Sequence, residues 1–418
     1  MKRSLLMASI LLTLSGSSIA QNVFDPADAI VRYSSSAAYG STQKPDSNVV
    51  GLQKWVANST NGVSTGTGAF KTISETYKAY FINYFNTRLA FRIKFPKSYS
   101  NPDSVNKKYP MMLFLHGAGE VGCASNGGIY NNEKQLALGG QLFAQRVDAN
   151  QFDGFLVYPQ LRSKDAGCWG EWGGGANNSN LITILTFIDS LVKYTRADND
   201  RLFIDGLSGG GVGTWRMAES FPLRVAKIAP TSAAGLVMDY PAFIHIPIWL
   251  ATGGKDTNPS PAMAGYSAQK VNDLGGSIRT SLYADLGHAS WYRHWGEADF
   301  LSYMNDVHKA NPLIFFNRFE FCPDSAINAR IGITPNFAAY EWQKDSVTIA
   351  TRINGVNTIV NGTALINFSS GGNEITVKSF GSYRVRFRRT AAGPWSDWSM
   401  KPAVIKSKTI TLTPPIAV

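Results

Sequence analysis

Cysteine is scarce in this chain of 418 residues, where only Cys123, Cys168 and Cys322 occur. No two of them stand at the spacing of zinc ligands, which argues against a structural metal site. In an exported protein one pair can form a disulfide, and the third thiol is then left over. Charged residues make up only 17% of the chain and apolar residues 44%, which is usual for a globular protein with a sizeable core. Extensive disorder is therefore not expected.

Apolar runs of transmembrane length are also missing, so no segment is expected to span a bilayer. The N-terminus instead has the three parts of a secretory signal. These are the basic Lys2 and Arg3, a short apolar run at residues 5–14, and small residues before a cleavage point near Ala20. We expect residues 1–20 to be removed on export, leaving a soluble protein that is secreted, periplasmic or at the cell surface.

The basic surplus is scattered rather than concentrated. The formal charge is +11, and it falls to +9 when Lys2 and Arg3 are removed. Such a surplus favours solubility, with some attraction to acidic polysaccharide, and a nucleic-acid partner is not expected.

The apolar pattern divides the rest of the chain. Residues 21–70 are rich in Ser, Thr, Asn and Gly and are expected to form an extended or loop-rich lead-in. Residues 71–312 should form an α/β domain, with an edge hairpin at 71–95, because short apolar runs alternate there with helical segments. That alternation predicts a mostly parallel sheet with helices on both faces. The expected strands are 109–115, 155–158, 201–205, 225–229, 248–252 and 278–284, and the expected helices are 181–194, 211–220 and 262–274.

The helical pattern stops near residue 312, and residues 322–418 hold short alternating strands that predict a small β-sandwich. One of these strands carries arginines at 384, 386 and 388, and the segment 395–399 reads Trp-Ser-Asp-Trp-Ser. This pair resembles the arginine–tryptophan ladder of fibronectin type III and cytokine-receptor domains, in which guanidinium groups stack on indole rings. An anionic binding patch is the alternative interpretation of the arginines.

The motif that points to chemistry is Gly-Leu-Ser-Gly-Gly at residues 206–210. It follows the expected strand 201–205 and precedes an expected helix. A serine on such a sharp strand-to-helix turn projects its hydroxyl, and the flanking glycines permit the tight backbone. Ser208 is therefore the candidate nucleophile, with a glycine-rich turn or phosphate loop as the alternative interpretation.

A serine nucleophile needs a base and a carboxylate that orients the base, and in α/β-hydrolases these follow in the order Ser, Asp, His. Asp256 comes just after the strand 248–252, and His288 comes just after the strand 278–284. His294 is the rival base, six residues further on. We predict Asp256 and His288 as the partners of Ser208.

The oxyanion of the reaction needs two amide donors. The amide of Gly209 begins a helix, and small residues at 116–120 follow the strand 109–115. We therefore assign the two donors to the amides of Gly209 and Ala118, with His116 shaping the loop.

Four motifs in register carry a family resemblance: residues 114–120, 200–211, 254–256 and 287–291. Over residues 75–310 the chain resembles the polyhydroxybutyrate-depolymerase-like esterases, which overlap the feruloyl and acetylxylan esterases of carbohydrate esterase family one. The resemblance implies an α/β-hydrolase fold and Ser208, Asp256 and His288 as the triad. A departure is the run of glycines after Ser208, where relatives often have a bulkier residue.

The resemblance also implies that strands 109–115 and 155–158 are neighbours, so that the loops after them leave the same sheet edge. A Cys123–Cys168 disulfide would then brace the mouth of the site, and two buried thiols are the alternative. Trp169, Trp172 and Trp291 lie on loops at this edge and are candidates for contacts with a sugar ring or an aromatic acyl group, or else for simple packing.

These observations favour a secreted serine esterase that needs no metal or organic cofactor and removes feruloyl or acetyl groups from plant polysaccharide. A polyester depolymerase or a serine peptidase with the same triad is the alternative enzyme, and the peptidase is disfavoured because no propeller-sized domain is present to gate the site. The non-enzymatic alternative is an inactive hydrolase fold that serves as a surface-binding module.

Overall fold

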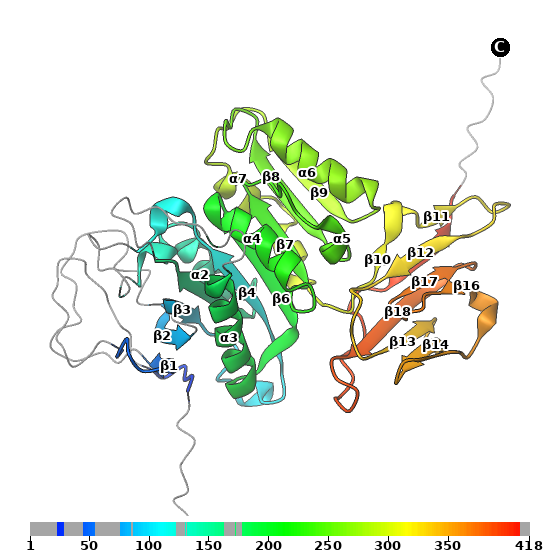
Figure 1. Ribbon diagram of the computed structural model, residues 1–418, viewed down its shortest axis with the longest axis horizontal. Coiled ribbons are helices and arrows are strands. Elements are labelled where there is room, and N and C mark those ends of the chain that lie inside the picture. The colour runs from blue at the N-terminus through cyan, green and yellow to red at the C-terminus, as the bar shows by residue number, and fades with distance from the viewer. Residues whose placement is uncertain are drawn as a thin grey trace, which may run out of the picture.

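The computed structural model describes residues 23–28, 45–54, 76–84, 87–122, 130, 132–162, 172 and 178–409. Its centre is a nine-stranded sheet in the order β1-β2-β3-β5-β4-β6-β7-β8-β9 (Figure 1). Strands β1, β2, β3 and β5 pair antiparallel, and all pairs from β5 to β9 are parallel. The strands are β1 (Gly51–Lys54), β2 (Lys78–Tyr84), β3 (Thr87–Lys94), β4 (Tyr109–Leu115), β5 (Phe155–Gln160), β6 (Ala197–Leu207), β7 (Lys227–Thr231), β8 (Ile248–Gly253) and β9 (Ile278–Tyr283).

Helices cover both faces of this sheet because its central strands are apolar on both sides. In β4, Leu113 belongs to the buried cluster on the face covered by α3 (Ser179–Tyr194), α4 (Gly209–Ser220) and α6 (Pro261–Asp273). The next residue, Phe114, points to the other face, where its ring contacts Phe143 of α2 (Gly140–Asp148) and Trp295 of α7 (Trp291–Trp295), in the cluster that also includes α8 (Phe300–Asn305). Figure 1 shows α3 and α4 lying together across one face. The predicted α/β class with a mostly parallel sheet is confirmed. No helix in the described parts of the chain is long and apolar enough to cross a membrane.

Two short segments of the expected lead-in are packed against the sheet. Strand β1 adds an antiparallel edge to β2, and Phe24 is buried against the ring of Tyr80 at a centroid distance of 4.9 Å. Lys54 forms an ion pair with Asp28. The lead-in therefore contributes an edge strand that alternation in the sequence did not indicate. The predicted signal at 1–20 lies outside the described residues.

The C-terminal part consists of two sheets that enclose one core, as expected for a β-sandwich. In Figure 1 it lies beside the α/β part. One sheet contains β10 (Leu313–Ile314), β12 (Ala329–Gly332), β17 (Glu374–Val377) and β16 (Leu365–Phe368). The other contains β11 (Glu320–Phe321), β19 (Ala403–Ser407), β18 (Gly381–Arg388), β13 (Ala339–Lys344), β14 (Val347–Ile353) and β15 (Val356–Ile359).

Two of the three arginines of β18, Arg386 and Arg388, stack on tryptophans as the sequence predicts. The Arg386 guanidinium lies 4.9 Å from the ring centroid of Trp395 and 4.6 Å from that of Trp398. Arg388 lies 4.5 Å from the Trp395 ring. These contacts place the guanidinium groups of Arg386 and Arg388 in a structural ladder.

Polar side chains fix the sandwich to the α/β part. Arg389, just beyond β18, forms an ion pair with Asp200 of β6 at 2.6 Å and donates to the carbonyl of Leu223 at 2.9 Å. On the other side of the junction, His245 lies 2.9 Å from the carboxylate of Glu374. These contacts make the junction a defined surface.

Candidate active site

Ser208 stands on a strained turn between β6 and α4. Its backbone has φ 53° and ψ −123°, in the left-handed half of the φ range that few residues other than glycine adopt. Glycine is required at two neighbouring positions. A Cβ on Gly206 would lie 2.4 Å from the Gly210 carbonyl oxygen, and one on Gly210 would lie 1.9 Å from the Leu115 carbonyl oxygen. The turn is therefore compressed against the sheet, and the serine hydroxyl projects from it.

The structure brings the three predicted triad residues into one hydrogen-bonded chain. His288 Nε2 lies 2.9 Å from Ser208 Oγ, and His288 Nδ1 lies 2.9 Å from Asp256 Oδ2. The Asp256 carboxylate is buried and also accepts the Asn258 amide at 3.0 Å, which fixes its orientation. The His288 side chain is 41% exposed, so the base can meet a ligand from solvent. In this arrangement a base can take the Ser208 proton while Asp256 stabilises the resulting imidazolium.

The two predicted oxyanion donors lie side by side. A Cβ on Gly209 would lie 3.4 Å from the amide nitrogen of Ala118, in ordinary contact. Gly209 is the first residue of α4, where an amide has no partner within the helix. Ala118 opens a short 3₁₀ turn, Ala118–Glu120, that follows β4.

The other histidines near the site are structural. His116 is fully buried, and burial lowers its pKa to about 4. Its Nε2 accepts the Leu161 amide at 3.0 Å, so its Nδ1 donates to the Gly117 carbonyl at 2.8 Å and supports the loop that carries Ala118. The rival base His294 is also fully buried, and burial lowers its pKa to about 3. It bonds Thr231 and does not bond Ser208.

The end of β7 links the predicted nucleophile Ser208 to the predicted base His288, and this link was not identified in the sequence analysis. The Ser208 amide donates to the Thr231 carbonyl at 2.9 Å. The next residue, Ser232, is buried with φ 49°, and its hydroxyl donates to the His288 carbonyl at 2.6 Å. Two adjacent residues at the end of β7, Thr231 and Ser232, therefore hold Ser208 and His288.

Replacing Ser232 with alanine should lower kcat about tenfold and leave KM nearly unchanged, because one hydrogen bond that positions His288 is lost. Alanine keeps a side chain at the same positive φ, so backbone strain does not change. Steady-state kinetics on an ester, with the unfolding temperature measured in parallel, checks this. An unchanged kcat with a lowered unfolding temperature would show that Ser232 only stabilises the fold.

A second group missed by sequence reasoning is Asp205, three residues before the nucleophile. Its side chain is fully buried on the face of the sheet that α7 covers. Burial raises the pKa of this carboxyl to about 8, and the nearby Trp295 indole and Arg146 guanidinium offset only part of the lost hydration. The carboxyl is therefore mostly protonated at neutral pH.

The three tryptophans predicted to contact substrate differ in their exposure and in whether the structure describes them. Trp172 is 1% exposed, packs against Gly213 of α4 and donates its indole N–H to the His116 carbonyl at 2.8 Å. The prediction that Trp172 contacts substrate is therefore wrong, because its ring is buried beneath the loop at residues 116–120 and is not accessible to a ligand. Trp291 is partly exposed and stands perpendicular to the His288 ring at a centroid distance of 6.0 Å. Trp169 lies outside the described residues.

Both cysteines of the predicted disulfide, Cys123 and Cys168, also lie outside the described residues. Cys322 is exposed with a free thiol. In the described parts of the chain, no group of three or more His, Cys, Asp or Glu side chains is placed to hold a metal ion.

Comparison with known proteins agrees with the fold. No protein-family model and no curated protein sequence matches the chain. Among solved structures, a thermostable esterase is 24% identical with a TM-score of 0.50, over 57% of this chain and 64% of that one, less than two thirds of its length. A ferulic acid esterase is 16% identical with a TM-score of 0.40, over 54% of this chain and 96% of that one. A feruloyl esterase module from Clostridium thermocellum, complexed with sinapinate, is 16% identical with a TM-score of 0.39, over 60% and 90%. The α/β part has the α/β-hydrolase fold.

Proposed function

We propose that this protein is a serine hydrolase that cleaves carboxylic esters. The observation that carries the proposal is the chain of two 2.9 Å contacts from Ser208 through His288 to a buried Asp256, with Ser208 on a strained turn at a helix N-terminus. An inactive fold would not be expected to keep this strain and this alignment together.

The reaction follows from the geometry. Ser208 Oγ bonds to the ester carbonyl carbon as its proton moves to His288 Nε2, and the oxyanion accepts from the amides of Gly209 and Ala118. The C–O bond to the alcohol then breaks, and His288 returns the proton to the departing oxygen. Water, deprotonated by His288, attacks the acyl-enzyme and releases the acid. Each oxyanion donor contributes on the order of 3 kcal/mol at the transition state.

The substrate we propose is a feruloyl or acetyl ester of plant polysaccharide. Support comes from the four sequence motifs that resemble carbohydrate esterases and from the predicted export signal. Trp291 supports an aromatic acyl group, because its partly exposed ring stands beside His288 and its buried indole N–H has no partner among the described residues. We further propose that a Cys123–Cys168 disulfide braces the mouth of this site.

A substrate panel tests the proposal. Methyl ferulate, acetylated xylan, polyhydroxybutyrate and a peptide set would be compared at equal enzyme concentration, with the rate of Ser208→Ala subtracted. We expect a higher kcat/KM on methyl ferulate or acetylated xylan than on the other two classes. Preferential release from polyhydroxybutyrate or peptides would reject the proposed substrate while keeping the serine mechanism.

A further inference from the structure

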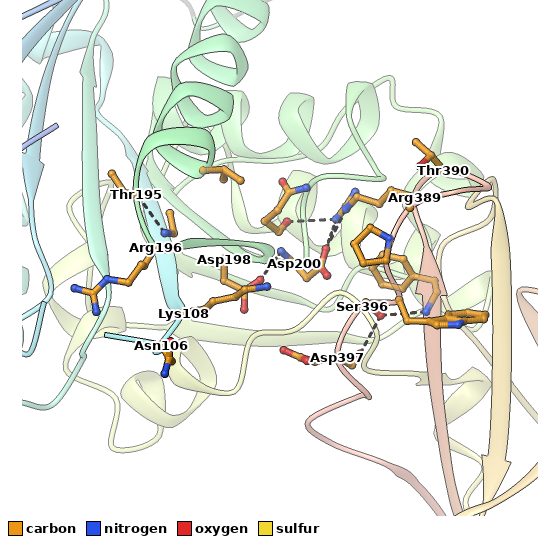
Figure 2. Close-up of a pocket in the computed structure, with 17 residues that line it drawn as sticks. Asn106, Lys108, Thr195, Arg196, Asp198, Asp200, Arg389, Thr390, Ser396 and Asp397 are labelled. Carbon is orange, nitrogen blue, oxygen red and sulfur yellow. Dashed lines mark hydrogen bonds and ion pairs between the residues drawn. The ribbon is translucent and has the colours of Figure 1, made fainter. Parts of the chain in front are cut away.

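A groove runs along the junction between the α/β part and the β-sandwich. It has a volume of about 430 Å³, within the range of ligand pockets. Figure 2 shows Asp198 and Asp200 of β6 on one wall and Arg389, Ser396 and Asp397 of the sandwich on the other. A second hollow of about 350 Å³ continues it toward His308 and shares four lining residues with it. Strand β6 runs from this groove to the nucleophile, so at about 3.3 Å per residue the groove lies about 30 Å from Ser208.

Most of the strong charges in the groove are already engaged. Arg389 is paired with Asp200, and Arg196 donates to the carbonyls of Ser104 and Tyr99. Two opposite charges remain at the rim, because Lys108 and Asp397 are exposed and form no ion pair with another described residue. A free ligand of either charge would be repelled by one of these two. The groove therefore favours a neutral ligand.

Two buried polar atoms at the groove have no partner among the described residues. His308 is 4% exposed, and its Nδ1 accepts the Ala310 amide at 3.1 Å. Burial lowers the pKa of His308, so the ring is neutral and its one proton lies on Nε2, which is a donor without an acceptor. On β6, between Asp198 and Asp200, Asn199 Oδ1 is an acceptor without a donor among the described residues. Buried donors and acceptors of this kind need a partner, and a hydroxyl can serve both.

We propose that the junction groove binds a neutral oligosaccharide segment. The hydroxyls of such a ligand donate to Asn199 and Asp198 and accept from His308 and Lys108. At the rim they also bond the exposed side chains of Asn106 and Asp397. Trp395, on whose ring Arg386 and Arg388 stack, also lines the groove and adds apolar ring atoms to its wall. Because the groove is remote from Ser208, it would hold a distant part of a polymer chain. It is thus an anchoring site, and its existence does not depend on which ester is cleaved.

The test uses the full chain with Ser208→Ala, so that binding is measured without hydrolysis. Xylohexaose and cellohexaose are the neutral probes, and hexagalacturonate is the acidic one. Binding is followed by calorimetry and by the ring signals of ¹⁵N-histidine-labelled protein. We expect a dissociation constant on the order of 1 mM for a neutral probe, with the His308 signal shifting and those of His116 and His294 unchanged.

A double variant locates the site. Asn106→Ala with Asp397→Ala removes two exposed groups of the groove, and Asn328→Ala with Asp324→Ala removes the same two residue types from another exposed part of the sandwich. The first pair should weaken binding at least about tenfold, and the second should leave it unchanged. Equal binding by both pairs, no saturable binding of either neutral probe, or preference for hexagalacturonate would overturn the proposal. Ester hydrolysis by the wild type is measured separately, so failure of the groove leaves the proposed function standing.

Discussion

Replacing Ser208 with alanine is expected to lower kcat for p-nitrophenyl acetate by a factor on the order of 10⁵. The variant keeps His288, Asp256 and the two proposed oxyanion amides, so the remaining rate measures what binding and electrostatics achieve without an acyl-enzyme. The substitution removes only the hydroxyl group, whose oxygen makes the 2.9 Å contact with His288 Nε2. Steady-state kinetics and mass spectrometry after incubation with a fluorophosphonate check the result, because wild type should gain one covalent adduct on Ser208 and the variant none.

The matched control is Ser370→Ala, an exposed serine of the β-sandwich, which should keep the wild-type rate and the adduct. Equal hydrolysis by wild type and Ser208→Ala would reject the serine mechanism. A wild type with neither hydrolysis nor adduct would instead favour an inactive hydrolase fold that serves as a surface-binding module.

Much of the α/β fold is readable from the sequence because its central strands are buried on both faces. The six expected strands between residues 109 and 284 correspond to β4 through β9, and the expected helices to α3, α4 and α6. The largest difference is the start of β6, at Ala197 rather than 201. Its first four residues, Ala-Asp-Asn-Asp, include three polar ones, so apolar alternation cannot reveal them. They extend the strand toward the sandwich and form part of the junction groove.

The site residues were predicted from their position after strand ends, a rule that depends on the sheet alone. Features that depend on which residues are neighbours in three dimensions were not identified in the sequence analysis. Trp172 follows the right strand, but its ring turns inward under the His116 carbonyl. Ser232 resembles any strand-end serine until its hydroxyl is seen at the His288 carbonyl. His308 and Asn199 lie at one groove although more than a hundred positions of the sequence separate them. No local sequence pattern indicates that two such distant residues are neighbours.

Asp205 provides the second large expected effect. Its carboxyl has a pKa near 3.9 in the unfolded chain and about 8 in the folded one. Below pH 4 both states are protonated and burial of the group costs no ionisation penalty. Between pH 4 and 8 only the unfolded state ionises, so the free energy of unfolding falls as pH rises, by up to about 1.4 kcal/mol per pH unit. Above pH 8 the whole penalty is present.

Asp205→Asn removes this titration, so the variant should become more stable relative to wild type as pH rises. The difference in free energy of unfolding should grow by on the order of 3 kcal/mol between pH 5 and pH 8. Urea unfolding followed by tryptophan fluorescence at four pH values measures it, with the exposed Asp324→Asn as the control that should follow wild type throughout. The comparison uses the slope with pH, so a constant offset from the changed side chain does not matter. Parallel curves for wild type and Asp205→Asn would mean that the carboxylate is ionised in the fold, held by Arg146 despite its burial.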